Sequence, residues 1–320
     1  MTLAWLLARN QHDVRLLCRT PEEAAAIAAS RRAPRMTSIE LPPNVTPLAD
    51  AARAVERADA LVIAVPSASL RENARSVRGA LPAGTLVVHG VKGIERGSGR
   101  RMSELLFEEL PQLDASSVCA LSGPNLAPEI ARGLPAATVV ACAEPANATR
   151  ARDLLHMPAF RVYTSHDVVG VELAGALKNV VAIAAGIADG LDYGDNAKAG
   201  IITRALAEIT RLGVAAGAEP ATFAGLAGIG DVMATCYSAL SRNRRAGEAL
   251  GRGTTPAEVL AASRDVIEGF GATDAACTLA AGLGVEMPIA AALRALVYEG
   301  AEPQTLIRRL LEREPRDEGV

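Results

Sequence analysis

The feature that most constrains the fold is an almost wholly apolar stretch at residues 170–186, GVELAGALKNVVAIAAG. Its small and aliphatic residues predict a helix that is buried on all sides. A buried ammonium group needs a partner, a ligand or a lowered pKa. The helix alone leaves open whether Lys178 is functional, reaches the surface along its aliphatic stem, or belongs to a structural ion pair. At helical spacing Lys178 shares a face with Val171, Ala174, Gly175, Ala182 and Ala185.

The length and composition of the chain favour an α/β protein of about two domains, since it has 320 residues. Half of the residues are hydrophobic but only 3% are aromatic, so aliphatic side chains must fill the core. The net charge of −3 and the pI of about 5.9 provide no general attraction to nucleic acid or to an anionic membrane. We therefore expect no nucleic acid partner.

Cysteine, histidine and hydropathy patterns predict a cytoplasmic protein without a metal site. The five cysteines form no CxxC pair, which favours buried thiols in a reducing compartment, and the four histidines lack metal-ligand spacing. We expect no stable membrane insertion, because no apolar run is predicted to have the roughly 20 residues that span a bilayer. We also expect no secretory signal at the start of the chain. Asp189, Asp192 and Asp195 lack the spacing of a calcium loop and are interpreted as a turn between helices.

Residues 1–167 alternate between short β-branched runs and helical patterns, which predicts a doubly wound domain with a parallel sheet covered on both faces. The expected strands are residues 14–18, 60–65, 85–91, 118–121, 137–141 and 161–163. The strands stop at about residue 168, so residues 168–320 are predicted to form an all-helical domain, with a frayed end at 312–318. The expected helices are residues 169–188, 197–216, 231–240, 243–250, 256–263, 273–283, 289–298 and 302–313.

The beginning of the chain departs from this plan. A doubly wound domain opens with a strand, a glycine-rich turn and a helix. Here residues 1–10 already have a helical pattern, and residues 1–60 contain no G-x-G-x-x-G. Either the domain holds no dinucleotide, or the chain begins after its first strand and phosphate loop. Arg19 follows the strand predicted at residues 14–18. In dinucleotide-binding domains an acidic residue at this position binds the ribose hydroxyls, so an arginine here favours NADP over NAD.

Two motifs follow predicted strands on the side where such sheets bind ligands. Lys92 follows the strand at 85–91, although a lysine exposed in a loop is the alternative. The sequence Ser-Gly-Pro-Asn at 122–125 precedes a helical run, where Asn125 could cap a helix whose first N–H groups favour an anion. The alternative for this motif is an ordinary strand-to-helix turn.

Two further motifs lie in the predicted helical domain. Asp231 follows a glycine-rich segment, AGLAGIG, where it could act in a site or simply cap a helix. The sequence SRNRR at 241–245 places a hydroxyl, an amide and guanidinium groups at a helix start, which suits an oxyanion or a phosphate. A capped helix with a basic surface is the alternative.

Together these motifs resemble the bacterial NAD(P)-dependent glycerol-3-phosphate dehydrogenase family over nearly the whole chain. Five motifs in order make the resemblance specific. The matching stretches are VKGIE at 91–95, LSGPNLAPEIA at 121–131, VELAGALKNVVAIAAGIADG at 171–190, GLAGIGDVMATCYSALSRNRRAG at 225–247 and VIEG at 266–269.

The resemblance implies hydride transfer between NAD(P)H and dihydroxyacetone phosphate, giving sn-glycerol 3-phosphate for phospholipid synthesis. It implies that Lys178 is the general acid/base, and that a phosphorylated small molecule is the partner. The implied substrate contacts are Lys92, Gly123, Asn125, Lys178, Asp231, Ser241, Arg242 and Asn243. The implied cofactor contacts are Arg19, Lys92, Ala127, Arg242, Val266 and Glu268.

The resemblance also has a departure. The family opens with a strand and G-x-G-x-W-G, whereas this chain starts near the end of that run, at Thr2-Leu3-Ala4. An N-terminally truncated member is therefore expected, with weak dinucleotide binding and an exposed strand edge. Two alternatives stay open: a β-hydroxyacid dehydrogenase of similar plan, and a non-catalytic remnant that binds a phosphate ligand. The apolar helical domain is also compatible with a homodimer.

Overall fold

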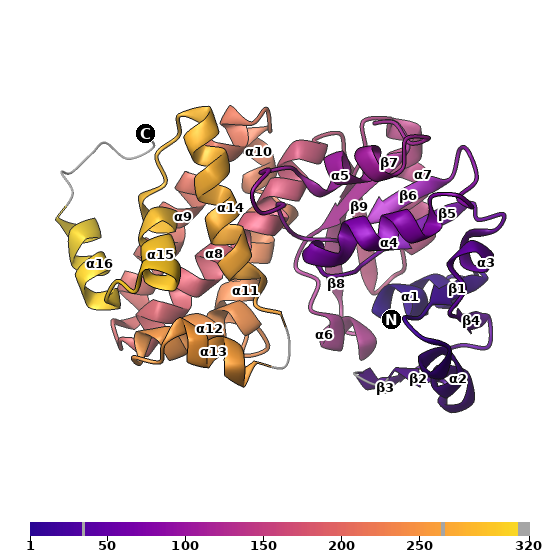
Figure 1. Cartoon of the computed structure of the whole chain (residues 1–320), viewed down its shortest axis with the longest axis horizontal. Coiled ribbons are helices and arrows are strands. Elements are labelled where there is room, and N and C mark those ends of the chain that lie inside the picture. Colours follow the sequence, from indigo (N-terminus) through magenta and orange to yellow (C-terminus); the bar gives the residue numbers. More distant parts are fainter. Residues whose placement is uncertain (34–35, 264–265, 313–320) are drawn as a thin grey trace. The chain divides into compact units, whose positions relative to one another are not determined.

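The computed structural model describes residues 1–33, 36–263 and 266–312, and its chain divides into two compact units (Figure 1). The first unit comprises Met1–Val91 and Met102–Val168, and the second comprises Lys92–Arg101 and Val169–Val320. The segment Lys92–Arg101, which we expected in the first domain, groups with the helical unit, where Lys92 and Arg101 form ion pairs with Asp231 and Glu172. Most of the predicted frayed end lies outside the described residues.

Five of the six predicted strands form a five-stranded sheet of order β5-β6-β7-β8-β9 in the first unit, and the strand predicted at 14–18 lies outside it. Their bounds are β5 Ala60–Ile63, β6 Leu86–His89, β7 Val118–Ser122, β8 Ala136–Ala141 and β9 Phe160–Ser165. All neighbouring pairs are parallel except β7 and β8, which are antiparallel, so the sheet is mixed rather than wholly parallel as expected. The carboxyl ends of β6 and β7 carry the two strand-end motifs noted above.

Helices cover both faces of this sheet, as predicted. Val87 and Val118 pack on one face with residues of α4 (Leu70–Val77) and α5 (Met102–Glu109). Leu86, Val88 and Cys119 pack on the other face with residues of α1 (Thr2–Arg9) and α7 (Pro145–Leu155). Burial on both faces explains why these strands are continuously apolar in sequence.

Two smaller sheets complete the strands of the first unit. β1 (Val14–Leu17) pairs in parallel with β4 (Val45–Leu48), and β2 (Arg32–Ala33) pairs in antiparallel fashion with β3 (Met36–Glu40). We did not predict β2, β3 and β4 because residues 32–48 combine prolines with polar residues and lack a clear alternation. The remaining helical segments are α2 Pro21–Ser30, α3 Ala51–Val55, η1 Ser67–Ser69 and α6 Ala127–Ala131.

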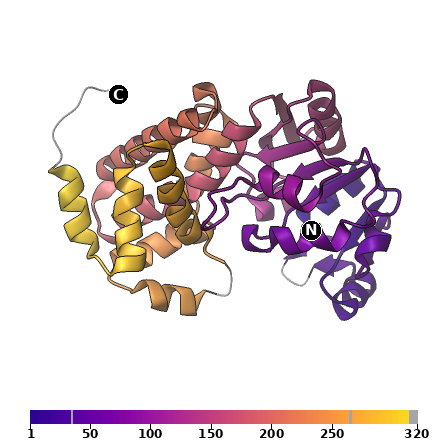
Figure 2. The same cartoon turned by 45° about the horizontal axis from the view of Figure 1, so that its top comes forward.

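From Val169 onward, the described residues of the second unit form helices joined by turns (Figures 1 and 2). Its central helix α8 (Val168–Gly190) has 18 of its 23 residues buried. Contrary to our expectation, α8 is long and apolar enough to span a membrane, but 83% of its apolar window is buried inside the protein. The other helices are α9 Gly194–Ala215, α10 Pro220–Phe223, α11 Asp231–Tyr237, α12 Arg242–Gly251, α13 Pro256–Ala262, α14 Glu268–Leu283, α15 Pro288–Glu299 and α16 Pro303–Leu311.

Glycines bring α8 and α12 into backbone contact. A Cβ atom on Gly186 of α8 would lie 2.0 Å from the carbonyl oxygen of Arg244, and one on Gly247 of α12 would lie 2.1 Å from that of Ile183. Only glycine permits so close an approach. The two helices that carry Lys178 and the SRNRR motif are therefore packed directly against each other.

Candidate active site

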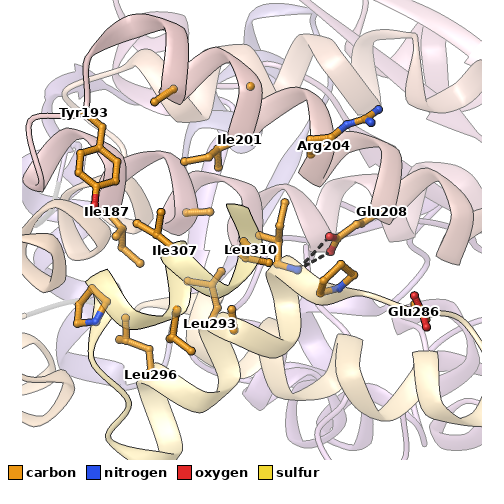
Figure 3. A pocket seen from close by; sticks show the side chains of 18 of the residues that line it. Ile187, Tyr193, Ile201, Arg204, Glu208, Glu286, Leu293, Leu296, Ile307 and Leu310 are labelled. Carbon is orange, nitrogen blue, oxygen red and sulfur yellow. Dashed lines mark hydrogen bonds between the residues drawn. The ribbon is translucent and has the colours of Figure 1, made fainter. Parts of the chain in front are cut away.

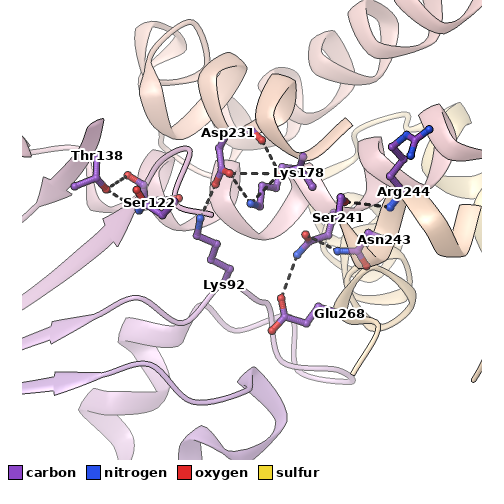
Figure 4. A network of polar contacts seen from close by, with 12 residues as sticks. Lys92, Ser122, Thr138, Lys178, Asp231, Ser241, Asn243, Arg244 and Glu268 are labelled. Atoms are coloured by element: carbon purple, nitrogen blue, oxygen red, sulfur yellow. Dashed lines mark hydrogen bonds and ion pairs between the residues drawn. The ribbon is translucent and has the colours of Figure 1, made fainter. Parts of the chain in front are cut away.

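Two lysines of the helical unit donate to one buried carboxylate. Lys178 Nζ lies 2.5 Å from Asp231 Oδ1, and Lys92 Nζ lies 2.6 Å from Asp231 Oδ2. The side chain of Asp231 is 1% exposed, that of Lys178 11% and that of Lys92 17%. Figure 4 shows both ammonium groups pointing toward this carboxylate. Lys92 is therefore not a solvent-exposed loop lysine, and Lys178 does not reach the surface.

Local structure explains how Asp231 reaches this position. A π-helical segment, Leu226–Gly230, precedes α11, and Gly228 within it has the non-helical angles φ −89° and ψ −106°. A Cβ atom on Gly228 would lie 2.0 Å from the carbonyl oxygen of Phe223, so this kink requires glycine. Asp231 is the first residue of α11, whose N-cap is Gly230. The capping role that we considered for Asp231 is wrong, because its carboxylate binds the lysines instead.

The surroundings shift the pKa values of the cluster. Burial, reinforced by the nearby charge of Lys92, lowers the pKa of Lys178 from 10.5 to about 8, although Asp231 opposes the shift. Burial alone would raise the pKa of Asp231, but the two ammonium groups outweigh it and hold that pKa below its usual value. The cluster thus combines a stable carboxylate with an ammonium that can lose its proton near neutral pH.

Thr235 is part of this cluster, although none of the sequence motifs singled it out. Lys178 Nζ donates to Thr235 Oγ1 at 3.0 Å, and Thr235 Oγ1 donates to the carbonyl oxygen of Asp231 at 2.6 Å. The helical spacing of Asp231 and Thr235 on α11 was the available signal, because residues four apart lie on the same face. Together they fix the direction of the Lys178 ammonium.

A second polar group surrounds the start of α12. Asn243 Nδ2 donates to Asn179 Oδ1 at 2.8 Å, and Asn243 Oδ1 accepts from the N–H of Gly269 at 3.0 Å. Asn179 Nδ2 lies 3.5 Å from Glu268 Oε2. Burial raises the pKa of Glu268, although the nearby charge of Arg242 opposes this. Asn179 directly follows Lys178 but was not predicted as a site residue, because its role depends on these distant partners.

The predicted helix start at SRNRR is confirmed. Ser241 is the N-cap of α12, and its Oγ accepts from the N–H of Arg244 at 3.2 Å. Ser241 and Asn243 are buried, while Arg242 is exposed. The first turn of α12 therefore presents an exposed guanidinium beside a fixed, capped helix terminus, an arrangement that suits an anion.

In the first unit, the predicted ligand residues after β7 form a tight turn. Gly123 has φ +148°, and a Cβ there would lie 2.9 Å from Cα of Thr138. Asn125 Nδ2 donates to Thr138 Oγ1 at 2.9 Å and does not cap α6, whose N-cap is Leu126. Asn125 Oδ1 and Ser122 Oγ are buried and have no hydrogen-bond partner among the described residues. This turn therefore has polar atoms available for a ligand.

The remaining predicted cofactor residues are dispersed. Arg19 follows β1 and is largely exposed, with its Nε atom 3.7 Å from Glu23 Oε2. Ala127 is the first residue of α6. Val266 is 54% exposed and lies two residues before the start of α14. Among the described residues, no group of three or more His, Cys, Asp or Glu side chains is arranged to hold a metal ion.

A cavity of about 620 Å³ in the helical unit lies apart from these residues (Figure 3). Its lining is mostly aliphatic and includes Ile187, Ile201, Leu293 and Ile307. The carboxylate of Glu208 in its wall accepts from the N–H groups at the start of α15. The predicted site residues are not part of this lining.

Family comparisons agree with the geometry. Residues 1–148 match the family model for the NAD-dependent glycerol-3-phosphate dehydrogenase N-terminus, and residues 167–308 match that for its C-terminus. The chain belongs to the NAD-dependent glycerol-3-phosphate dehydrogenase family. Glycerol-3-phosphate dehydrogenase [NAD(P)+] of Chlorobium limicola is 44% identical over 318 residues, covering 99% of this chain and 96% of the relative.

Two other members of the glycerol-3-phosphate dehydrogenase family extend the comparison. The Streptomyces avermitilis glycerol-3-phosphate dehydrogenase [NAD(P)+] is 46% identical over 314 residues, covering 98% of this chain and 93% of the relative. The crystal structure of glycerol-3-phosphate dehydrogenase from Coxiella burnetii has a TM-score of 0.91 at 35% identity, covering 98% of this chain and 95% of that one. Both the sequence family and the two-unit fold are therefore shared.

Proposed function

We propose that this protein interconverts dihydroxyacetone phosphate and sn-glycerol 3-phosphate with NAD(P)H, and that Lys178 is its general acid/base. The observation that supports the proposal is the pair of lysines on the buried Asp231 carboxylate, in a chain of this family. A lysine held by a carboxylate in a largely dry site can carry a proton in both directions of a carbonyl reaction.

The proposed chemistry assigns a separate task to each lysine. When the substrate carbonyl gains a hydride, its oxygen becomes an alkoxide and needs a proton at the same moment. Lys178 donates that proton in reduction and removes it in oxidation. The positive charge of Lys92 stabilises the developing alkoxide. Asp231 and Thr235 keep the Lys178 ammonium in one orientation while it exchanges the proton.

Phosphate binding is proposed for the first turn of α12. The helix N-terminus, the Ser241 hydroxyl, the Arg242 guanidinium and the Asn243 amide can all donate to phosphate oxygens. Gly123 and Asn125 border the substrate in this proposal, and the free Asn125 Oδ1 suits a substrate hydroxyl. Binding a phosphate away from the reacting carbon supplies orientation and therefore lowers the activation barrier.

The residues present support a nicotinamide cofactor. When bound, NAD(P)H supplies the hydride. The buried polar atoms at the end of β7 lack protein partners among the described residues, which fits a polar ligand on that side of the sheet. In the proposal Arg19, Lys92, Ala127, Arg242, Val266 and Glu268 contact the dinucleotide. Arg19 favours NADP because a guanidinium can bind a 2′-phosphate.

We also propose a task for each unit and a location for the protein. The first unit is assigned to dinucleotide binding and the helical unit to substrate binding and catalysis. A cytoplasmic location is supported by five free thiols, and independence from nucleic acid by the net charge of −3. We further propose that the apolar helical unit supports a homodimer without stable membrane insertion, which sedimentation velocity would test.

The deciding experiment compares substrates and measures cofactor binding separately. NADPH consumption with dihydroxyacetone phosphate should exceed that with dihydroxyacetone, while oxidation of sn-glycerol 3-phosphate should exceed that of 3-hydroxyisobutyrate. A preference for 3-hydroxyisobutyrate would favour a β-hydroxyacid dehydrogenase. Titration of NADPH fluorescence tests the non-catalytic alternative, because a chain that binds phosphate ligands but neither NADPH nor NADH cannot perform this reaction.

A further inference from the structure

One carboxylate joins three helices near the start of α12. Asp189 of α8 accepts from Lys198 Nζ of α9 at 2.9 Å and from Arg244 Nε of α12 at 2.8 Å, both at Oδ2. Of the three aspartates predicted to form a turn, Asp189 lies in α8 and Asp195 in α9, so only Asp192 is in the turn between these helices. The proposed catalytic chemistry does not use Asp189, yet it has cationic partners from two other helices.

The environment makes these ion pairs strong enough to hold the helices in place. The side chains of Lys198, Arg244 and Asp189 are 7%, 19% and 20% exposed, so solvent screens them only partly. The Lys198 ammonium also lies 4.6 Å from the centre of the Tyr237 ring. Removing the shared carboxylate would leave two cations close together, and they would separate.

Arg244 connects this cluster to the proposed phosphate site. The backbone N–H of Arg244 donates to Oγ of Ser241, the N-cap residue. Its side-chain Nε donates to Asp189, and its Nη1 lies 3.6 Å from Glu248 Oε2. The first turn of α12 is therefore held through both the backbone and the side chain of one residue. Since α12 also packs directly on α8 through Gly247, the position of this turn is set relative to the helix that carries Lys178.

We propose that Asp189 is a positioning residue that sets the affinity for the substrate's phosphate group. It holds the first turn of α12 through Arg244, at a fixed separation from the Lys178 ammonium. The ligand class is the phosphate monoester of a small ketone or alcohol. This inference rests on the proposed function, because it requires the phosphate to bind at Ser241–Asn243.

The test is Asp189→Asn, with Asp192→Asn as the matched control. Asp192 is exposed in the turn that follows α8, at φ +54°, a conformation that asparagine tolerates. For Asp189→Asn we expect KM for dihydroxyacetone phosphate to rise about tenfold or more with kcat nearly unchanged, because misplacing a binding group weakens orientation. Activity on dihydroxyacetone, which lacks the phosphate, should stay the same. Asp192→Asn should match the wild type in every measurement.

A double-mutant cycle shows whether Asp189 acts through Arg244. In Arg244→Gln the Asp189 carboxylate stays paired with Lys198. This variant therefore still tests the inference if Asp189→Asn fails to fold. It should reproduce the rise in KM, and the double variant should be no worse than either single variant. Equal losses on both substrates, or an unchanged KM in both variants, would overturn the inference. A wild-type protein inactive on dihydroxyacetone phosphate would instead contradict the proposed function.

Discussion

Lys178 and Asp231 form a contact of 2.5 Å between two side chains that are 11% and 1% exposed. Neither charge would be stable alone at this depth, because an unpaired buried ion carries a large desolvation cost. Lys92 adds a second ammonium on the other carboxylate oxygen. Two positive charges facing one negative charge leave the cluster electropositive, which suits an alkoxide as it forms.

Replacing Lys178 by Ala should abolish turnover and leave cofactor binding intact. The variant loses its proton donor, so kcat should fall by ~10²–10⁴, the usual contribution of general acid/base catalysis. NADPH affinity, measured by fluorescence, should change little because the ammonium is directed at Asp231 and Thr235. Retention of more than about a tenth of the rate would contradict the role of Lys178.

The pH dependence of the reaction should follow the lowered pKa of Lys178, about 8. Ketone reduction requires the protonated ammonium, so its rate should be highest below pH 8 and fall as the pH rises through that value. Oxidation requires the neutral amine and should show the opposite dependence. Initial rates in both directions between pH 6 and about 10, at saturating substrate, measure this profile.

Variants of the two charged neighbours should move that profile in opposite directions. Lys92→Met removes a like charge, so the pKa of Lys178 and the midpoint of the profile should rise. Asp231→Asn removes the opposite charge, so the midpoint should fall. Shifts of the same sign in both variants would show that another group controls the profile.

Much of the site was predictable, and the unpredicted part has a common physical reason. The apolar surroundings of Lys178 indicated a buried lysine, and the glycine-rich segment before Asp231 marked that aspartate as a candidate site residue. Sequence could not pair Lys92 with Asp231, because these residues lie 139 positions apart and meet only in the tertiary fold. Asn179 was missed for the same reason, since the start of α12 and Glu268 supply its partners.

The secondary structure was predictable where a local sequence pattern specifies it. Long helices such as α8 and α9 were predictable because their periodicity extends over many turns. The π-helical segment Leu226–Gly230 was not, because it includes non-helical backbone angles at Gly228 that hydrophobic periodicity does not encode. The antiparallel direction of β8 was also missed, since apolar runs do not encode strand direction.

The ion pair between Arg101 and Glu172 should hold the segment Lys92–Arg101 on the helical unit. Arg101 Nη1 lies 2.6 Å from Glu172 Oε2, and the Glu172 side chain is 1% exposed. Glu172→Gln should lower the free energy of unfolding by about 3 kcal/mol, because neutralising one member of a buried ion pair is strongly destabilising. Urea unfolding followed by circular dichroism measures the change.

The control is Arg96→Gln in the same segment. Arg96 Nε lies 3.6 Å from Asp274 Oδ2, but the Arg96 side chain is 62% exposed. Loss of this guanidinium should therefore change the free energy of unfolding by less than about 1 kcal/mol. Equal effects of the two variants would mean that burial does not decide the strength of these contacts.

The backbone contact between α8 and α12 leads to the last prediction. Gly247→Ala would place a Cβ atom 2.1 Å from the carbonyl oxygen of Ile183, so α12 must move away from α8. Overpacking of this kind costs about 1–3 kcal/mol, which should appear as a lowered midpoint of urea unfolding. KM for dihydroxyacetone phosphate should rise as well, because the proposed phosphate-binding turn moves with α12.

Gly282→Ala is the matched control, since Gly282 lies in α14 with no atom within 4 Å of its added Cβ. There alanine should raise stability by about 0.4–1 kcal/mol, because it restricts the unfolded chain and favours the helix. The same substitution is thus expected to have opposite signs at the two positions. A stabilised Gly247→Ala variant with unchanged KM would show that the close approach of α8 and α12 does not position the phosphate.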